Sequence, residues 1–336
     1  MKIKTCYFII FLLAALYLQS FETQAANRVK IVTIGGGFNA INAGADSNNP
    51  HRLVDRMKEF WKRELDKVMH HKPDLILLTE VCDNPGGLNN QERDEYYRVR
   101  KNQIQDYFGS IAKENRCYIA FGTKRDDNGI WRNSIVVMDR EGKMAGVYNK
   151  NYPIIPEMNS GIAPCDKTPL IQCDFGTVVG ALCFDLNFDE LRERNAALRP
   201  DIILFASQWH GGLEQAKWAF SCRSFFVCSY SFRTFPTEIR NPFGYVIASS
   251  IHSQNYAVAT VNLDRKIVLG NPQKITALQK KYGDKVMVNI DDLLGQTMIT
   301  SEHEQVSAAD MVKEFEFELM DNFFERAKQI RTQNLK

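Results

Sequence analysis

The sequence predicts an α/β domain in which strands and helices form stacked layers. Short apolar runs that end at turn residues alternate with longer segments whose apolar residues recur at helical spacing. Two further strand-like runs follow one another near residue 250 without a helix between them. Strands that alternate with helices and then pair directly are typical of layered α/β domains. An apolar share of 44% over 336 residues is ample for such a core.

The individual elements follow from these patterns. Strands are expected where a run is short, apolar or β-branched and bounded by turn residues, at 29–34, 74–78, 117–122, 133–139, 144–149, 177–182, 201–206 and 225–229. Residues 243–249 and 256–263 are expected to pair as a closing hairpin. Helices are expected over 51–71, 95–114, 189–194, 213–223 and 307–331.

The N-terminus has the pattern of a secretory signal peptide. Lys2 and Lys4 precede an apolar run at 7–18, and small residues follow at Ala25 and Ala26. The run is only about 12 residues long, whereas a membrane-spanning helix needs roughly 20. We therefore expect residues 1–25 to be a signal peptide and the protein to be exported, to the periplasm or the extracellular space.

The net charge and the cysteine content limit which macromolecular partners and which metal sites are expected. A formal charge of +2 is close to zero for this length, so neither a nucleic acid nor a membrane surface is indicated as a partner after signal cleavage. Without Cys6, seven of the eight cysteines remain, and an odd number leaves at least one thiol without a partner inside the chain. No two cysteines have the spacing of a metal finger, so no metal site is expected.

Three predicted strands end on side chains that carry chemistry: Glu80, Lys150 and Cys183. Each has an ordinary explanation when taken alone, because the glutamate and the lysine could emerge into solvent and the cysteine could belong to the core. If the three strands are neighbours, however, the three groups meet at one edge. Cys183 also lies at a strand-to-helix corner, which favours the thiolate and offers backbone N–H groups to an oxyanion.

Together these strand ends resemble the nitrilase superfamily of carbon–nitrogen hydrolases. The resemblance is carried by the segments Leu77–Glu80, Tyr148–Lys150 and Gly180–Leu191, and by Ala206–Trp209. It covers about residues 29–269 and implies an αββα four-layer sandwich, a Glu80–Lys150–Cys183 catalytic triad, and neither a metal nor an organic cofactor. By its place seven residues after the lysine, Glu157 resembles a fourth catalytic residue of the family.

The resemblance also assigns roles. Glu80 would act as general base on the Cys183 thiol, and Lys150 with the Phe184 backbone N–H would bind the developing oxyanion. Glu157 would position the substrate or tune Lys150. Asn187 stands where many members carry arginine, and Asp189 stands where proline is common. These departures concern the pocket, for which we expect Phe184, Asn187 and Trp209 as lining residues.

The predicted domains are a carbon–nitrogen hydrolase domain at 27–270 and a C-terminal extension at 271–336. The extension is expected to contain a long helix, of which the apolar stripe would pack on the domain or on a partner subunit. Members of the superfamily often form dimers, so a homodimer is one of the assemblies left open.

The expected function is hydrolysis of a non-peptide carbon–nitrogen bond in a small linear amide through a cysteine thioester. N-carbamoyl amine hydrolysis and nitrile hydrolysis on the same triad are alternatives. A papain-like enzyme that pairs a cysteine with His210 or His252 is a further one, although the sequence around Cys183 lacks the papain-type signature. A binding protein on the same fold, without turnover, is the alternative from another class.

Overall fold

The computed structural model describes residues 26–335, and the signal peptide predicted at 1–25 lies outside them. The chain divides into two compact units, a larger one at Arg28–Leu263 and a smaller one that begins at Asp264. The division falls before residue 270 because β13 (Arg265–Val268) pairs with β15 (Gln296–Ser301), a strand of the smaller unit.

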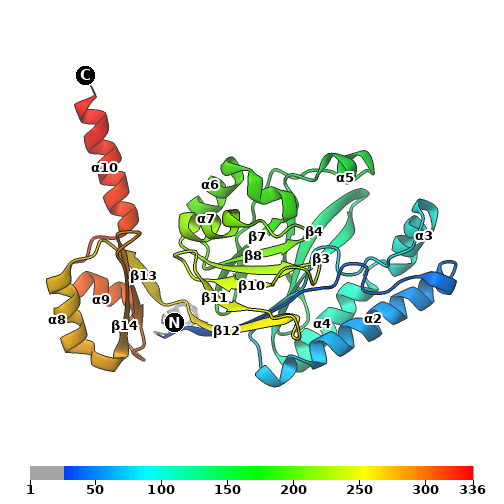
Figure 1. Ribbon diagram of the computed structural model, residues 1–336, viewed down its shortest axis with the longest axis horizontal. Helices are drawn as coiled ribbons and strands as arrows, with labels where there is room; N and C mark the ends of the chain where they lie inside the picture. Colours follow the sequence, from blue (N-terminus) through cyan, green and yellow to red (C-terminus); the bar gives the residue numbers. More distant parts are fainter. Residues whose placement is uncertain (1–25, 336) are drawn as a thin grey trace, which may run out of the picture. The chain divides into compact units, whose positions relative to one another are not determined.

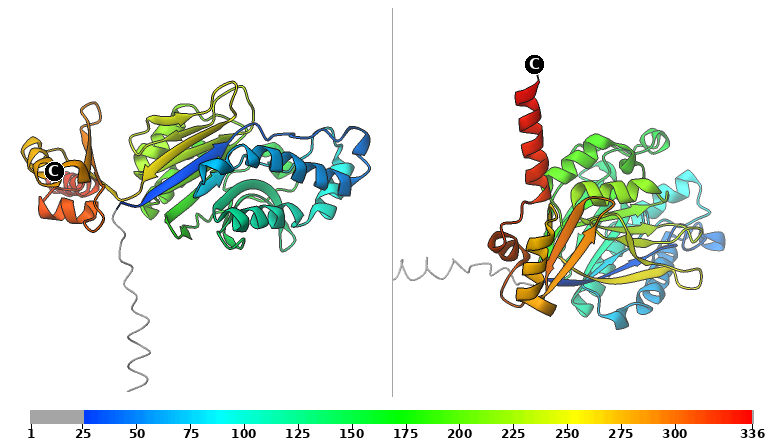
Figure 2. Two further views of the ribbon diagram at one scale, coloured as in Figure 1. Left: turned by 90° about the horizontal axis from the view of Figure 1, so that it is seen from below. Right: turned by 60° about the vertical axis from the view of Figure 1, so that its left-hand side comes forward.

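The larger unit is built from two six-stranded sheets (Figure 1). The first sheet has the order β12-β1-β2-β3-β4-β5. Its strands are β1 (Arg28–Ile34), β2 (Leu75–Leu77), β3 (Tyr118–Asp127), β4 (Ile130–Met138), β5 (Met144–Asn149) and β12 (Tyr256–Asn262). The three central strands run parallel and the outer ones antiparallel. Strands β1 and β12 lie side by side although they come from opposite ends of this unit (Figure 2).

The second sheet repeats this plan, with the order β11-β10-β9-β8-β7-β6 and three parallel central strands. Its strands are β6 (Ile171–Cys173), β7 (Gly176–Leu182), β8 (Ile202–Ser207), β9 (Phe225–Tyr230), β10 (Glu238–Arg240) and β11 (Val246–Ser249). All residues of β8 and β9 are buried, as expected for central parallel strands that are covered on both faces.

Three apolar cores separate four layers, which confirms the αββα sandwich. One core lies between the first sheet and the helices α2 (Pro50–Asp66), α3 (Asn90–Arg100) and α4 (Gln103–Asn115). The second core lies between the two sheets. The third lies between the second sheet and the helices α6 (Asp189–Leu198) and α7 (Leu213–Cys222). A short helix, α5 (Ile155–Asn159), interrupts the loop that follows β5.

The two sheets approach each other closely at Gly180 of β7. A Cβ atom added at Gly180 would stand 2.5 Å from the Cβ of Tyr148 on β5, far inside van der Waals contact. Only glycine leaves room there for the buried Tyr148 ring. The glycine thus lets a side chain of the first sheet pass across the middle core to the second sheet.

Two expected elements of this unit are wrong. The closing hairpin does not exist, because β11 pairs with β10 in the second sheet whereas β12 pairs with β1 in the first. The single helix at 95–114 is two helices, α3 and α4, separated at Lys101, which has a left-handed φ of 44°. The break accompanies the buried ion pair between Arg100 and Asp83, which anchors the end of α3 to the core.

The smaller unit has a core of its own. A three-stranded sheet, β13-β15-β14, packs with α8 (Pro272–Tyr282) and α9 (Ala308–Glu314), and β14 spans Val286–Asp291. The long helix expected at 307–331 is divided into α9 and α10 (Met320–Asn334). Glu316 has a φ of 51° between them, and Phe317 is buried in this core. Among residues 26–335, no helix combines the length and apolarity that crossing a membrane requires.

Candidate active site

Four of the predicted site residues line one cavity of about 330 Å³: Glu80, Lys150, Glu157 and Cys183. Glu80 follows β2 and Lys150 follows β5, so both come from the first sheet, whereas Cys183 follows β7 of the second. The three strands are therefore not neighbours in one sheet. The groups meet because the two sheets lie face to face and these strands end on the same side of the sandwich.

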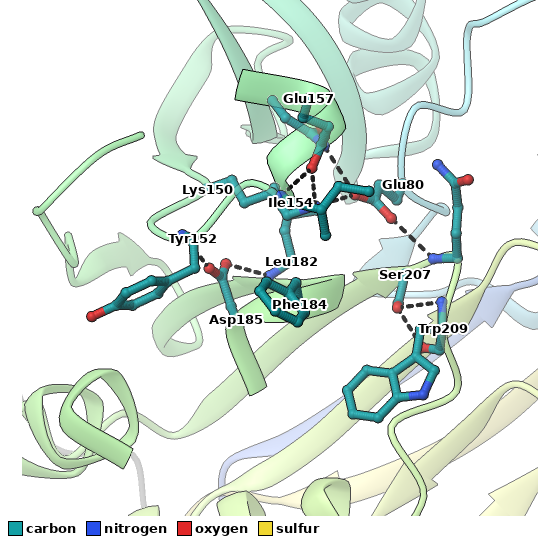
Figure 3. Close-up of polar contacts among 12 residues, drawn as sticks. Glu80, Lys150, Tyr152, Ile154, Glu157, Leu182, Phe184, Asp185, Ser207 and Trp209 are labelled. Atoms are coloured by element: carbon teal, nitrogen blue, oxygen red, sulfur yellow. Dashed lines mark hydrogen bonds and ion pairs between the residues drawn. The ribbon is translucent and has the colours of Figure 1, made fainter. Parts of the chain in front are cut away.

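Lys150 is the centre of a buried polar cluster (Figure 3). Its Nζ lies 3.0 Å from Glu80 Oε1 and 2.8 Å from Glu157 Oε2, and its side chain is 2% exposed. Burial alone would lower the pKa of Lys150, but the two carboxylates outweigh burial and raise it. Burial alone would raise the pKa of Glu157, but Lys150 and the Asn133 amide outweigh burial and lower it. Lys150 and Glu157 therefore remain charged at neutral pH.

Asn133 ties the two carboxylates together and was not predicted from the sequence. Its Nδ2 donates to Glu80 Oε1 at 2.9 Å and to Glu157 Oε1 at 2.7 Å. The side chain is fully buried, and it follows the charged residue Arg132 at the point where β4 becomes apolar. The sequence feature that could have indicated this role is an asparagine at the start of the apolar part of a strand, because a buried amide needs hydrogen-bond partners.

Glu80 is held by a tight turn. Its second oxygen, Oε2, accepts a hydrogen bond from the backbone N–H of Gln208 at 2.9 Å. Val81 after it has a φ of 49°, a left-handed conformation that is a genuine outlier for a β-branched residue. Gly122 on β3 makes room for this turn, because a Cβ there would come within 2.6 Å of the Glu80 Cα. Such strain is typical of functional sites.

Cys183 lies at a similarly strained corner, with a φ of 48°. It begins a 3₁₀ turn, Cys183–Asn187, that leads into α6. The carboxylate of Asp185 holds the corner by accepting from the N–H groups of Leu182 and Tyr152, both at 2.8 Å (Figure 3). It also accepts from the Tyr148 hydroxyl at 2.7 Å. Sequence reasoning missed this role, since an aspartate after a strand is also an ordinary turn residue.

The thiol itself is expected to be protonated at rest. Burial, with Glu80 as a second contributor, raises the pKa of Cys183 to about 11, while Lys150 acts weakly in the other direction. The expectation that the corner favours the thiolate is therefore wrong: the loss of solvent outweighs the nearby cation. Attack by this sulfur requires a base that removes its proton as the reaction proceeds.

The protonated thiol predicts an unusual pH profile for alkylation. Because the thiolate fraction rises tenfold per pH unit below the pKa, the rate of Cys183 modification by iodoacetamide should climb steadily to beyond pH 9.5. A free cysteine, with a pKa near 8.5, should level off about two units lower. Peptide-resolved mass spectrometry measures both rates, and a Cys183 rate that is already level at about pH 7 would show a preformed thiolate.

The other three expected pocket residues do not line this cavity. Phe184 lies in an adjacent apolar depression with Tyr152, Ile155 and Phe188. Asn187 donates to the Phe184 carbonyl at 3.0 Å and so stabilises the 3₁₀ turn. Trp209 is 40% exposed, and its backbone N–H binds the Ser207 hydroxyl at 2.8 Å. Its neighbour Gln208 lines the cavity instead.

Comparison with known proteins identifies the family. The sequence model of the carbon–nitrogen hydrolase family matches residues 48–265, which is more than half of the chain. The chain belongs to that family, and it is a carbon–nitrogen hydrolase. Among curated proteins no sequence match is found.

Solved structures of similar fold agree with this assignment. A carbon–nitrogen hydrolase from Helicobacter pylori G27 is 16% identical with a TM-score of 0.53, over 71% of this chain and 90% of that one. An amidase from Nesterenkonia sp. is 12% identical with a TM-score of 0.59, over 72% and 93%. The NitFhit protein of C. elegans is 17% identical with a TM-score of 0.55, over 76% and 64%. At these identities the likeness extends to the fold.

The histidine alternatives lie apart from the hydrolase's cavity. His210 Nδ1 accepts from the Gly212 N–H at 3.3 Å, and its Nε2 lies 3.9 Å from Glu238 Oε2. Burial lowers its pKa, and its ring packs against Tyr230. Neither His210 nor His252 lines the cavity that contains Cys183. No group of three or more side chains suited to binding a metal ion occurs within residues 26–335.

Proposed function

We propose that this carbon–nitrogen hydrolase cleaves the amide bond of a small linear substrate through a thioester on Cys183. The observation that carries the proposal is the shared cavity, in which a protonated thiol lies with a carboxylate and a lysine that are paired with each other. A variant of the Nesterenkonia sp. AN1 amidase, which has a similar fold, reacts with acrylamide at its active-site cysteine. That chemistry supports a nucleophilic role for the cysteine here.

In the proposed reaction, Glu80 removes the thiol proton while Sγ forms a bond to the amide carbon. The carbonyl oxygen gains negative charge, which the Lys150 ammonium and the Phe184 backbone N–H stabilise. When the C–N bond breaks, Glu80 returns the proton to the leaving ammonia or amine. The same carboxylate then takes a proton from water, which attacks the thioester. The C–S bond breaks, the acid leaves, and Glu80 returns the proton to the Cys183 sulfur. Glu157 and Asn133 hold Lys150 and Glu80 in position throughout.

Trapping the thioester tests this proposal. Acid quenching during turnover of a primary amide should leave Cys183 heavier by the mass of the acyl group, and ammonia should appear in the medium. A panel of amides, N-carbamoyl amines and nitriles separates the three substrate classes. His210→Ala should keep most of its activity, because His210 does not line the cavity. Loss of activity in that variant alone would favour a cysteine–histidine enzyme. A wild type that turns over none of the panel would favour a binding protein.

We also propose that the hydrolase is exported after cleavage near Ala26. The basic start, the short apolar run and the small residues at Ala25 and Ala26 support this. Expression with its own N-terminus in a bacterial host should give exported protein that begins near Ala26. Intact mass spectrometry measures the N-terminus, and exported protein that retains Met1 would contradict the prediction.

A further inference from the structure

The cavity wall formed by α3 and β3 carries two more cationic side chains, Arg93 and Lys124. Both are half-buried. Neither was singled out by the sequence, since a lysine and an arginine on a helix or strand are usually solvated. The side chains of Asn39 and Asn84 lie near them on the same cavity. This wall is therefore polar and positively charged.

Neither cation has an ion-pair partner among the described residues. Within residues 26–335, Lys124 Nζ forms no ion pair and no side-chain hydrogen bond. Burial lowers the pKa of Lys124; Glu157 acts against that, and Arg93 adds to it. Arg93 donates from Nη2 to the Leu88 carbonyl at 2.9 Å, but its buried Nε–H has no acceptor among the described residues. A buried donor without an acceptor is costly unless a ligand supplies one.

Arg100, on the same helix, provides a comparison, because the protein supplies several hydrogen-bond acceptors to its guanidinium. Its guanidinium binds the Asp83 carboxylate, the Thr123 hydroxyl at 3.0 Å and the Lys124 carbonyl at 2.6 Å. The Arg100 guanidinium is thus surrounded by acceptors. Arg93 and Lys124 instead face an open cavity with donors to spare.

The charges of the cavity leave room for an anion. Its ionisable lining comprises two carboxylates, Glu80 and Glu157, against the three cations Lys150, Arg93 and Lys124, and the Cys183 thiol is neutral. Lys150 is paired with both carboxylates, so the excess positive charge lies on the α3 and β3 wall. A neutral amide would leave this excess charge in a partly desolvated site.

We propose that the amide substrate of this hydrolase carries a carboxylate, which Arg93 and Lys124 bind while Cys183 attacks the amide carbon. The inference rests on the amidase function proposed above and specifies its substrate class. A guanidinium and an ammonium on one wall match a carboxylate by charge-assisted hydrogen bonds. Both residues also line a second cavity of about 540 Å³, which Asp94 lines as well, so the substrate carboxylate would bind where the two cavities share Arg93 and Lys124. The adjacent apolar depression around Phe184 suits the rival substrate, a neutral amide with an apolar chain.

Matched substrates test the inference. One pair consists of the monoamide of glutaric acid and the neutral amide of pentanoic acid, which share their chain length. A second pair places the carboxylate on the amine side instead, as in N-acetylglycine against N-acetylmethylamine. The wild type should prefer the carboxylate member of at least one pair by about 100-fold in kcat/KM, because the site's donors stay unpaired with a neutral substrate.

The variants Lys124→Met and Arg93→Met remove the charge and keep an unbranched side chain, which is close to lysine in length and shorter than arginine. Each should lower kcat/KM for the carboxylate substrate by about 30-fold or more, and should lower kcat/KM for the neutral substrate much less. Lys124→Arg keeps the charge and should retain the preference. Arg98→Met is the matched control on α3, because Arg98 is exposed, pairs with Glu95 and does not line the catalytic cavity.

Binding separates failure of this inference from failure of the proposed chemistry. Calorimetry of Cys183→Ala with glutarate needs no turnover, and Lys124→Met in that background should weaken the affinity by about 30-fold. Hydrolysis of both substrate members at equal kcat/KM, without glutarate binding, would overturn the inference and leave the amidase proposal intact. Equal losses on both members in the Met variants, or preference for a long apolar amide, would also overturn it. Lysine-dependent binding without any hydrolysis would support the carboxylate site and contradict the chemistry.

Discussion

Replacing Cys183 by alanine is expected to lower kcat for amide hydrolysis by on the order of 10⁴-fold or more, because no other nucleophile can form the thioester. Stability should change by less than about 1 kcal/mol, since the sulfur makes no ion pair and the side chain is only half-buried. Ammonia release under saturating amide measures the first effect, and urea denaturation followed by circular dichroism measures the second.

Cys165→Ala is the matched control, because Cys165 is the other half-buried cysteine within residues 26–335. It does not line the cavity with Glu80 and Lys150, so this variant should keep wild-type turnover. Undiminished activity in Cys183→Ala would rule out the proposed mechanism. Equal losses in both variants would indicate a general disturbance of the fold.

Lys150→Met is expected to reduce both activity and stability. Turnover should fall by about 10²- to 10³-fold, since the oxyanion loses its cation. The free energy of unfolding should fall by about 3–5 kcal/mol at neutral pH, because Glu80 and Glu157 are left as unpaired carboxylates in a buried site. Kinetics with the same amide and urea denaturation give the two quantities.

The sign of the pH effect follows from the Glu157 carboxyl. In the wild type its pKa is held below the ordinary value of 4.5, so its stabilising contribution is present above that pH and is lost as the pH falls through the lowered pKa. In Lys150→Met the Glu157 carboxylate loses this cation and takes up a proton more readily. The stability difference between variant and wild type should therefore shrink on going from pH 8 to pH 5.

A double variant serves as the control for the second prediction. Adding Glu157→Gln to Lys150→Met removes one of the two uncompensated charges, so part of the lost stability should return while turnover stays low. Asn133 can still donate to Glu80 in this variant, which keeps that carboxylate satisfied. A double variant no more stable than the single one would show that charge burial is not the cause.

The sequence predicted those site residues whose position follows from the residues next to them in the chain. Glu80, Lys150 and Cys183 each follow a short apolar strand, so periodicity placed them at strand ends, and the resemblance to nitrilases joined them. Asn133 and Asp185 were missed because their importance lies in partners far along the chain, Glu80 and Tyr148 respectively. No local pattern distinguishes a buried hydrogen-bonded amide or carboxylate from a turn residue.

The errors in the fold have the same origin. Two strands in succession, β11 and β12, favour a hairpin locally, but each finds a better partner in a different sheet. The helices end at Lys101 and Glu316, which adopt left-handed conformations although neither is a glycine. Helix propensities therefore do not predict these two breaks. Tertiary packing determines where these breaks fall. The buried ion pair between Arg100 and Asp83 fixes the chain next to Lys101, and the buried Phe317 fixes it next to Glu316.

The contact between Gly180 and Tyr148 has a consequence for how this enzyme can vary. The base and the nucleophile are attached to opposite sheets, so the thickness of the middle layer sets the gap that the proton must cross. A methyl group added deep in that layer, remote from any substrate, would change the rate as well as the folding free energy. The rate of the reaction therefore depends on the spacing between the two sheets. Selection for turnover also constrains the volume of the side chains that pack between them.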